Sequence, residues 1–151
     1  MMSFEEMLLR LGVAALLGAI LGLERQMAGK DAGVRTQMMV SAGAALFTLA
    51  ALSIPYALDF ANRAEMLVFI QGNAGYTNLI ANIVLGVGFL GSGLIVRQGL
   101  HARSLTTAAT VWFIAGVGIL SGLGMLAFAA AATASAAIVL AILRRIDPPH
   151  D

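Results

Sequence analysis

Five long apolar runs, separated by short polar segments, most constrain what this chain can fold into. They cover residues 7–23, 38–54, 79–96, 105–121 and 123–143. A transmembrane helix needs about 20 mostly apolar residues to cross a hydrocarbon core of about 30 Å. Because 60% of the 151 residues are hydrophobic and only 11% are charged, a soluble domain would have no interior for so much apolar surface. The sequence therefore predicts an all-α polytopic membrane helix bundle of about five transmembrane helices.

The segment between the second and third runs is predicted to connect them outside the hydrocarbon core. Pro55 is expected to stop the second span, because proline cannot donate a helix hydrogen bond. Residues 66–70 are apolar but too few to span, so we expect them to lie in the membrane interface. The polar run 71–73 is predicted to form a turn.

The basic residues predict how the bundle is oriented. Lys and Arg in short loops favour the cytoplasmic side. With five spans, seven of the nine basic residues fall on one side and two on the other. We therefore expect the amino terminus outside and the carboxyl terminus cytoplasmic. Residues 1–146 are predicted to form one transmembrane domain, and residues 147–151 a tail too short to fold. The seven are Arg25, Lys30, Arg35, Arg97, Arg103, Arg144 and Arg145, and the two are Arg10 and Arg63.

The loop after the first run carries an unusual concentration of charge. Five charged side chains lie within residues 24–35, between two almost wholly apolar segments. Glu24 and Arg25 are adjacent, about 100° apart on a helix, so we expect them to pair with other helices and not with each other. They either reach the interface as topology anchors, or Glu24 forms an interhelical network with an arginine on the same side of the membrane. The candidate partners of Glu24 are Arg35, Arg97 and Arg103. The candidate functional polar cluster comprises Glu24, Arg25, Arg35, Thr36, Asn82, Arg97, Arg103, Thr106 and Thr107.

The third run has the most unusual helix face. Four glycines lie within residues 86–93, although each glycine inside a helix costs about 1 kcal/mol in water. Asn78, Asn82 and Gly86 are spaced by four and share a face, which we expect to point at protein or water. This face either packs closely on another helix or lines a permeation or ligand groove. The residues expected to mediate helix packing are Gly18, Gly22, Gly86, Gly88, Gly91, Gly93, Gly118 and Gly122.

Several kinds of chemistry lack the residues they require. Without cysteine there is no disulfide, thiolate metal site or thiol catalysis. No phosphate-binding loop motif occurs, which argues against nucleotide hydrolysis. Glu24 is the only acid expected at membrane depth, so a dedicated Mg²⁺ pore within one subunit is poorly supported. The basic residues are scattered and the net charge is +1, which argues against nucleic-acid binding. We expect no enzyme activity, no cofactor and no bound metal.

Three blocks of the sequence resemble the MgtC/SapB family of bacterial inner-membrane proteins. Residues 22–25 read GLER and are followed by AGVRT at 32–36 and GAALF at 43–47. Residues 86–93 read GVGFLGSG, and residues 105–112 read LTTAATVW. The order and spacing of the blocks match the family as well.

The resemblance implies a five-span bundle with the orientation given above. It also implies links to growth at low magnesium and to survival inside macrophages, with regulation of a membrane complex such as the F-type ATP synthase. Many members carry an ACT-like carboxyl-terminal domain, and we expect this sequence to contain only the transmembrane domain. The family often has Arg near Asn78, Gln at Asn82 and His at Gln37, so roles at these positions are not transferred.

Two functions are consistent with these features. The first is a regulatory membrane protein that binds another membrane complex, which the small-residue faces and the arginine-rich cytoplasmic rim favour. The second is an oligomeric transporter or channel for a small solute or a magnesium-related ion, for which the Asn82 face and Glu24 would provide the polar groups. The lipid bilayer is a partner in both, and a homo-oligomer fits either.

Overall fold

The computed structural model describes residues 2–58, 60–72, 77–97 and 103–146, in which every regular element is a helix. Five of the six helices are long and apolar enough to span a membrane, and α3 is the exception. This confirms the predicted all-α bundle with five candidate spans. The helices are α1 (Phe4–Met27), α2 (Val34–Ala57), α3 (Arg63–Gly72), α4 (Thr77–Arg97), α5 (Arg103–Gly122) and α6 (Leu126–Ile146).

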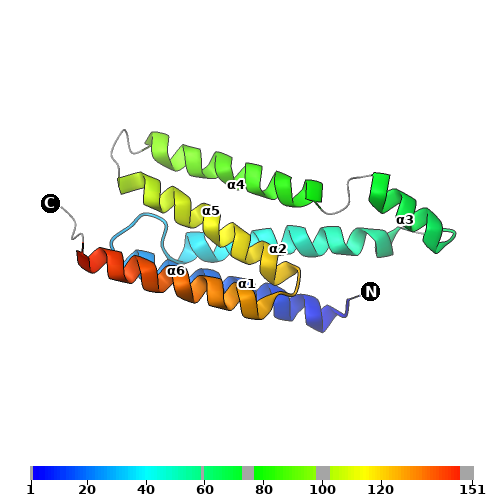
Figure 1. Cartoon of the computed structure of the whole chain (residues 1–151), viewed down its shortest axis with the longest axis horizontal. Helices are drawn as coiled ribbons and strands as arrows, with labels where there is room; N and C mark the ends of the chain where they lie inside the picture. Colours follow the sequence, from blue (N-terminus) through cyan, green and yellow to red (C-terminus); the bar gives the residue numbers. More distant parts are fainter. Residues whose placement is uncertain (1, 59, 73–76, 98–102, 147–151) are drawn as a thin grey trace.

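The most buried span is α5, which contacts α1, α2, α4 and α6. Figure 1 shows α4 on one side of α5 and α6 on the other. α1 begins at the end of the bundle where α3 lies, and α6 ends at the opposite end (Figure 1). The start of the first span and the end of the last therefore face opposite sides, as an odd number of spans requires. Which end is cytoplasmic stays a prediction.

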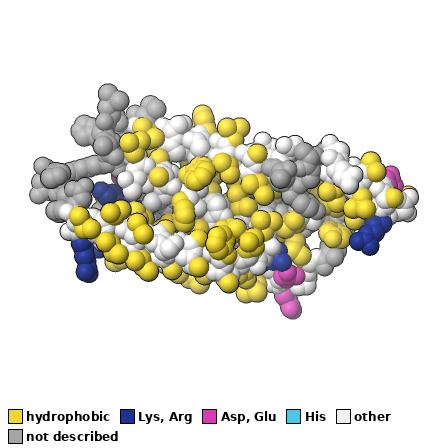
Figure 2. Space-filling model, viewed as in Figure 1, with side chains coloured by type: hydrophobic (Ala, Val, Ile, Leu, Met, Phe, Trp, Pro, Cys, Tyr) yellow, Lys and Arg dark blue, Asp and Glu magenta, His cyan; other side chains and the backbone are white. Residues whose placement is uncertain are grey.

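Two apolar clusters hold the helices together around α5. In the first, Leu17 and Leu21 of α1 pack with Ile114 and Val117 of α5 and with Ala129 of α6. The second joins α5 to α2 and α4 and comprises Ala44, Ile83, Ala115 and Ile119. Elsewhere the helices expose large apolar side chains, which cover the middle of the face in Figure 2 while charged side chains lie toward its ends. This surface suits a lipid environment, since lipid tails are as apolar as the side chains.

Two helix ends are set by glycines in the left-handed region. Gly29 has φ +67° and Gly124 has φ +86°. After α1, Lys30 N donates to Arg25 O and Gly29 N donates to Gln26 O; after α5, Met125 N and Gly124 N donate to Leu120 O and Ser121 O in the same pattern. These are Schellman motifs, which satisfy the last carbonyls of a helix and let the chain reverse.

Two expectations for the connector are wrong. α2 continues through Pro55 to Ala57, because a proline in the last turn removes only one helix bond and Leu58 N still donates to Ile54 O. Gln71 and Gly72 belong to α3 and not to a turn, and residue 73 lies outside the described residues. α3 buries none of its residues, which agrees with a helix lying in the interface but does not test that prediction.

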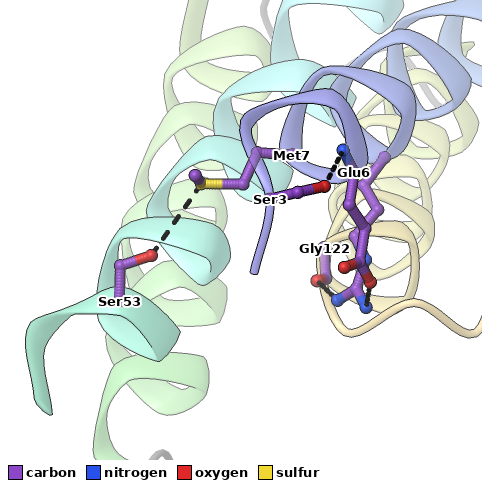
Figure 3. A network of polar contacts seen from close by, with 6 residues as sticks. Ser3, Glu6, Met7, Ser53 and Gly122 are labelled. Carbon is purple, nitrogen blue, oxygen red and sulfur yellow. Dashed lines mark hydrogen bonds and ion pairs between the residues drawn. The ribbon is translucent and has the colours of Figure 1, made fainter. Parts of the chain in front are cut away.

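A polar clip joins α1 to the tight α5–α6 connection. Arg10 donates from Nη1 to Gly122 O at 2.8 Å and from Nη2 to Glu6 Oε1 at 2.5 Å. Figure 3 shows Glu6 and Gly122 on this network beside Ser3, whose hydroxyl accepts from Glu6 N and caps α1. Arg10 thus satisfies a carbonyl at the carboxyl end of α5. Its positive charge also interacts favourably with the negative end of the helix dipole.

Candidate functional site: a buried polar layer between α1, α2 and α5

Glu24 and Arg25 are buried together in the last turns of α1, with 7% and 3% of their surface exposed. Arg25 Nε donates to Glu24 Oε2 at 2.5 Å. The expectation that these neighbours would not pair with each other is therefore wrong. Both side chains are long enough to bend toward each other, and an unpaired charge buried at this depth would be far more costly than the bend.

The other arginines of the predicted network do not test whether Glu24 also pairs with another helix. Arg35 is exposed in the first turn of α2, while Thr36 beside it is half-buried. The side chains of Arg97 and Arg103 lie outside the part of the chain that the structure describes. The interhelical network of Glu24 with these residues stays a prediction.

Four further members of the site are among the buried polar side chains of α2 and α5. Gln37 of α2 is fully buried and donates from Nε2 to Thr110 Oγ1 of α5 at 3.1 Å and to Ala32 O at 3.4 Å. Thr110 in turn donates to Thr107 O at 2.8 Å. Ser41, one turn further along α2, is also fully buried. We call Glu24, Arg25, Gln37, Ser41, Thr107 and Thr110 the polar layer.

The polar layer lies next to the first apolar cluster. Leu21 of α1 packs in that cluster with Ile114 of α5. Glu24 and Arg25 follow Leu21 by one helical turn, and Thr110 precedes Ile114 by one turn, on helices that run in opposite directions. Three atoms of the layer are buried without a hydrogen-bond partner among the described residues, namely Glu24 Oε1, Gln37 Oε1 and Ser41 Oγ.

Sequence reasoning missed Gln37 and Ser41 as members of the site. A glutamine near the start of an apolar run resembles an ordinary helix-end residue. The available signal was the spacing of Gln37, Ser41 and Thr48, which places three polar side chains on one face of α2. Of the predicted threonines, Thr107 is buried in the layer whereas Thr106 is exposed.

Four predicted packing glycines hold α2 between α1 and α5. A Cβ on Gly18 would lie 2.6 Å from Gln37 O, and one on Gly22 would lie 2.6 Å from Val34 Cα. On the other side, a Cβ on Gly118 would collide with Ser41 O, and one on Gly122 would lie 2.7 Å from Thr48 Cβ. Glycine is required at these four positions because the α2 backbone occupies the space of a side chain.

The glycines of α4 behave differently. Gly91 faces Ala108 of α5, where a Cβ would make an ordinary contact at 3.6 Å. At Gly86, Gly88 and Gly93 a Cβ would have nothing within 4 Å. Among the described residues nothing packs against these three glycines, because α4 turns Ile83 and its apolar neighbours toward α5. Asn82 is exposed on the open side with Gly86.

Comparison with known proteins shows the family of this bundle. The profile of the MgtC family matches residues 11–148, almost the whole chain. The chain belongs to the MgtC family. Among curated relatives, Protein MgtC of Brucella abortus is 40% identical over 131 residues, which is 87% of this chain and 48% of that protein. Protein MgtC of Salmonella typhimurium is 42% identical over 126 residues, which is 83% of this chain and 47% of that protein.

The chain thus spans about half the length of the MgtC proteins it matches. No solved structure matches it. Family membership and five candidate spans together indicate a multi-pass membrane protein.

The chemistry available to this MgtC family chain is that of hydrogen bonding and charge at membrane depth. Within the described residues, no three His, Cys, Asp or Glu side chains come together as a metal site would need. The polar layer instead offers one carboxylate already paired with a guanidinium, together with an amide and hydroxyls. Such a layer suits helix coupling or the binding of a small polar ligand.

Proposed function

We propose that this chain is a regulatory protein of the bacterial inner membrane that acts by binding another membrane protein. The observation that supports this is the open face of α4. Only 11% of the membrane-crossing stretch of α4 is buried, against 56% in α5. Gly86, Gly88 and Gly93 lie on that helix with free space around them, and the amide of Asn82 is exposed at membrane depth.

The chemistry of this face fits a protein neighbour better than lipid. Lipid tails offer no partner to an amide, whereas a neighbouring helix can hydrogen-bond to it. Small residues also let the backbone of a second helix approach closely. Such close packing drives helix association in membranes, because lipid tails are as apolar as the helix surfaces and supply no hydrophobic driving force. α6 is equally unburied, but it contains no Asn or Gln and so offers no side-chain amide to a neighbouring helix.

The resemblance to the MgtC/SapB family suggests which partner to test first. It implies regulation at low magnesium and during survival inside host cells, through restraint of the F-type ATP synthase. We propose this complex as the partner, with the chain acting by contact and without enzyme activity of its own.

Co-purification from mild detergent tests the proposal. We expect the wild-type chain and Ala130→Leu, a change on the exposed side of α6, to retain the partner. Gly86→Leu should lose it, because the added side chain blocks close approach without touching the chain's own core. Recovery of the chain alone in several detergents would count heavily against an interaction protein. Loss of the partner from Ala130→Leu as well would show that α4 is not the contact surface.

The alternative function is an oligomeric transporter or channel for a small solute or magnesium-related ion. The observation in its favour is a buried polar layer with acceptor oxygens of Glu24 and Gln37 that no described residue satisfies. In that case the α4 face joins copies of this chain. Reconstituted liposomes distinguish the two functions, since a transporter produces ion or solute flux above empty controls and a regulator does not.

A further inference from the structure

Three buried atoms of the polar layer define a set of unmet hydrogen bonds. Glu24 Oε1 and Gln37 Oε1 can only accept a hydrogen bond, whereas Ser41 Oγ can donate one and accept others. The orientation of the Gln37 amide follows from its two donated bonds to Ala32 O and Thr110 Oγ1. Its oxygen is therefore the atom that remains without a donor.

The layer does not satisfy these atoms internally. The Ser41 hydroxyl has one proton and can serve one of the two acceptors at most. Thr110 already donates to Thr107 O, and Arg25 Nε already donates to Glu24 Oε2. The Nη groups of Arg25 and the hydroxyl of Thr107 are further donors of the layer, but in the structure none of them bonds to Glu24 Oε1 or Gln37 Oε1. In this arrangement these acceptors therefore need a donor from outside the layer. Native proteins rarely bury such an atom without a partner, because its desolvation is not compensated.

Charge and space restrict what the external donor is. Glu24 and Arg25 already neutralise each other, so a further cation would place an uncompensated positive charge beside a buried guanidinium. A divalent ion would also need more carboxylate ligands than this layer supplies. Gly18 and Gly118 bring the backbones of α1 and α5 against α2 on either side of Ser41, so the helices are closely packed there and a small occupant fits better than a large one.

We infer that the polar layer binds ordered water. Water is neutral and small, and it supplies two donors and two acceptors. It donates to Glu24 Oε1 and Gln37 Oε1 and accepts the proton of Ser41 Oγ, as buried waters do for polar groups that the protein leaves unsatisfied. Hydration of the layer also replaces part of the solvation that burial removes from the Glu24–Arg25 pair. This inference does not depend on the proposed partner.

Water-edited solid-state NMR of the labelled full chain in lipid bilayers tests the inference. In this experiment magnetisation passes from water to protein groups that lie next to it. The side-chain amide of Gln37 is the probe, and the backbone amides of Leu21 and Ile114 are the controls. All three residues are fully buried, so burial alone predicts equally weak signals. The exposed side-chain amide of Gln26 gives the signal of a hydrated group.

We expect the Gln37 amide to gain several-fold more signal than Leu21 and Ile114 at short mixing times, approaching Gln26. A Gln37 signal as weak as those controls would overturn the inference, because the layer would then be dry. A second sample, in which N-methylglucamine replaces sodium and potassium, identifies the occupant. An unchanged Gln37 signal supports water, whereas loss or displacement of that signal would show that a metal cation occupies the layer instead.

Discussion

At the scale of single residues, the Glu24–Arg25 pair determines how charge is accommodated inside the bundle. Each partner is buried, with side-chain exposures of 9% and 4%, so neither charge is solvated by bulk water. A buried pair of this kind contributes little net stability when intact, yet removing one partner is costly because the other is left uncompensated.

We therefore expect Glu24→Gln to destabilise the fold by about 3 kcal/mol, since it leaves the Arg25 guanidinium buried without its counter-charge. The control is Asp31→Asn in the exposed loop at the same end of α1, which should change stability by less than about 0.5 kcal/mol. Unfolding in detergent, followed by helix loss on heating, measures both variants. Equal small effects would mean that Glu24 serves only as a topology anchor at the interface.

A second residue-scale prediction concerns the clip at the other end of α1. Arg10→Met keeps most of the side chain's length but removes the bonds to Gly122 O and Glu6 Oε1. We expect a loss of about 1–2 kcal/mol, because the side chain is partly exposed and charged hydrogen bonds contribute about 1.5–3 kcal/mol when buried. Arg63→Met on exposed α3 is the matched control. If both variants unfold alike, the clip does not secure the α5–α6 connection.

At the scale of helices, the central element of the bundle is α2 held between two glycine pairs. Gly18 and Gly22 let the α2 backbone pack closely on α1. On the other side, Gly118 and Gly122 let it pack closely on α5. The contact at Gly118 is the most restrictive, because the atom that a side chain would strike is a backbone carbonyl and cannot change rotamer. α4 has similar glycines, but no described residue lies within contact distance of them on its open side.

This difference predicts opposite results for the same substitution on two helices. Gly118→Ala should cost about 1–3 kcal/mol, since α5 must move away from α2. Gly86→Ala should leave stability unchanged or raise it by up to about 1 kcal/mol, because the methyl group meets nothing and alanine favours the helix. Thermal unfolding of the two variants in one detergent makes the comparison. A similar loss at both positions would indicate that α4 packs against the chain in solution.

The number and type of spans followed from the sequence because long apolar runs leave few alternatives. The span ends were harder, since the Schellman glycine Gly29 lies in a polar segment beyond the first apolar run and Gly124 lies inside the run 123–143. Periodicity showed that Asn78, Asn82 and Gly86 share a face but not whether that face is covered. The spacing of Gln37 and Ser41 places both on one face of α2, but it does not show that Gln37 bonds to Thr110, 73 residues away in the sequence. No local pattern reveals a contact of that kind.

At the scale of the whole molecule, the bundle places its first loop and its amino terminus at opposite ends. The distribution of Lys and Arg then predicts that the loop is cytoplasmic. Because the chain has no cysteine, single cysteine variants report this directly. A membrane-impermeant maleimide should label Ser3→Cys in intact cells and Asp31→Cys only after permeabilisation. The reverse pattern would invert the proposed topology.

The central claim is that the open face of α4 binds another protein in the membrane. The most direct measurement attaches a photo-crosslinker to Gly86→Cys in native membranes and compares it with Ala134→Cys, an equally small and exposed position on α6. We predict a discrete protein adduct from Gly86→Cys, whose mass distinguishes a second copy of the chain from a different partner, and only lipid adducts from Ala134→Cys. Lipid adducts alone at both positions would contradict the claim.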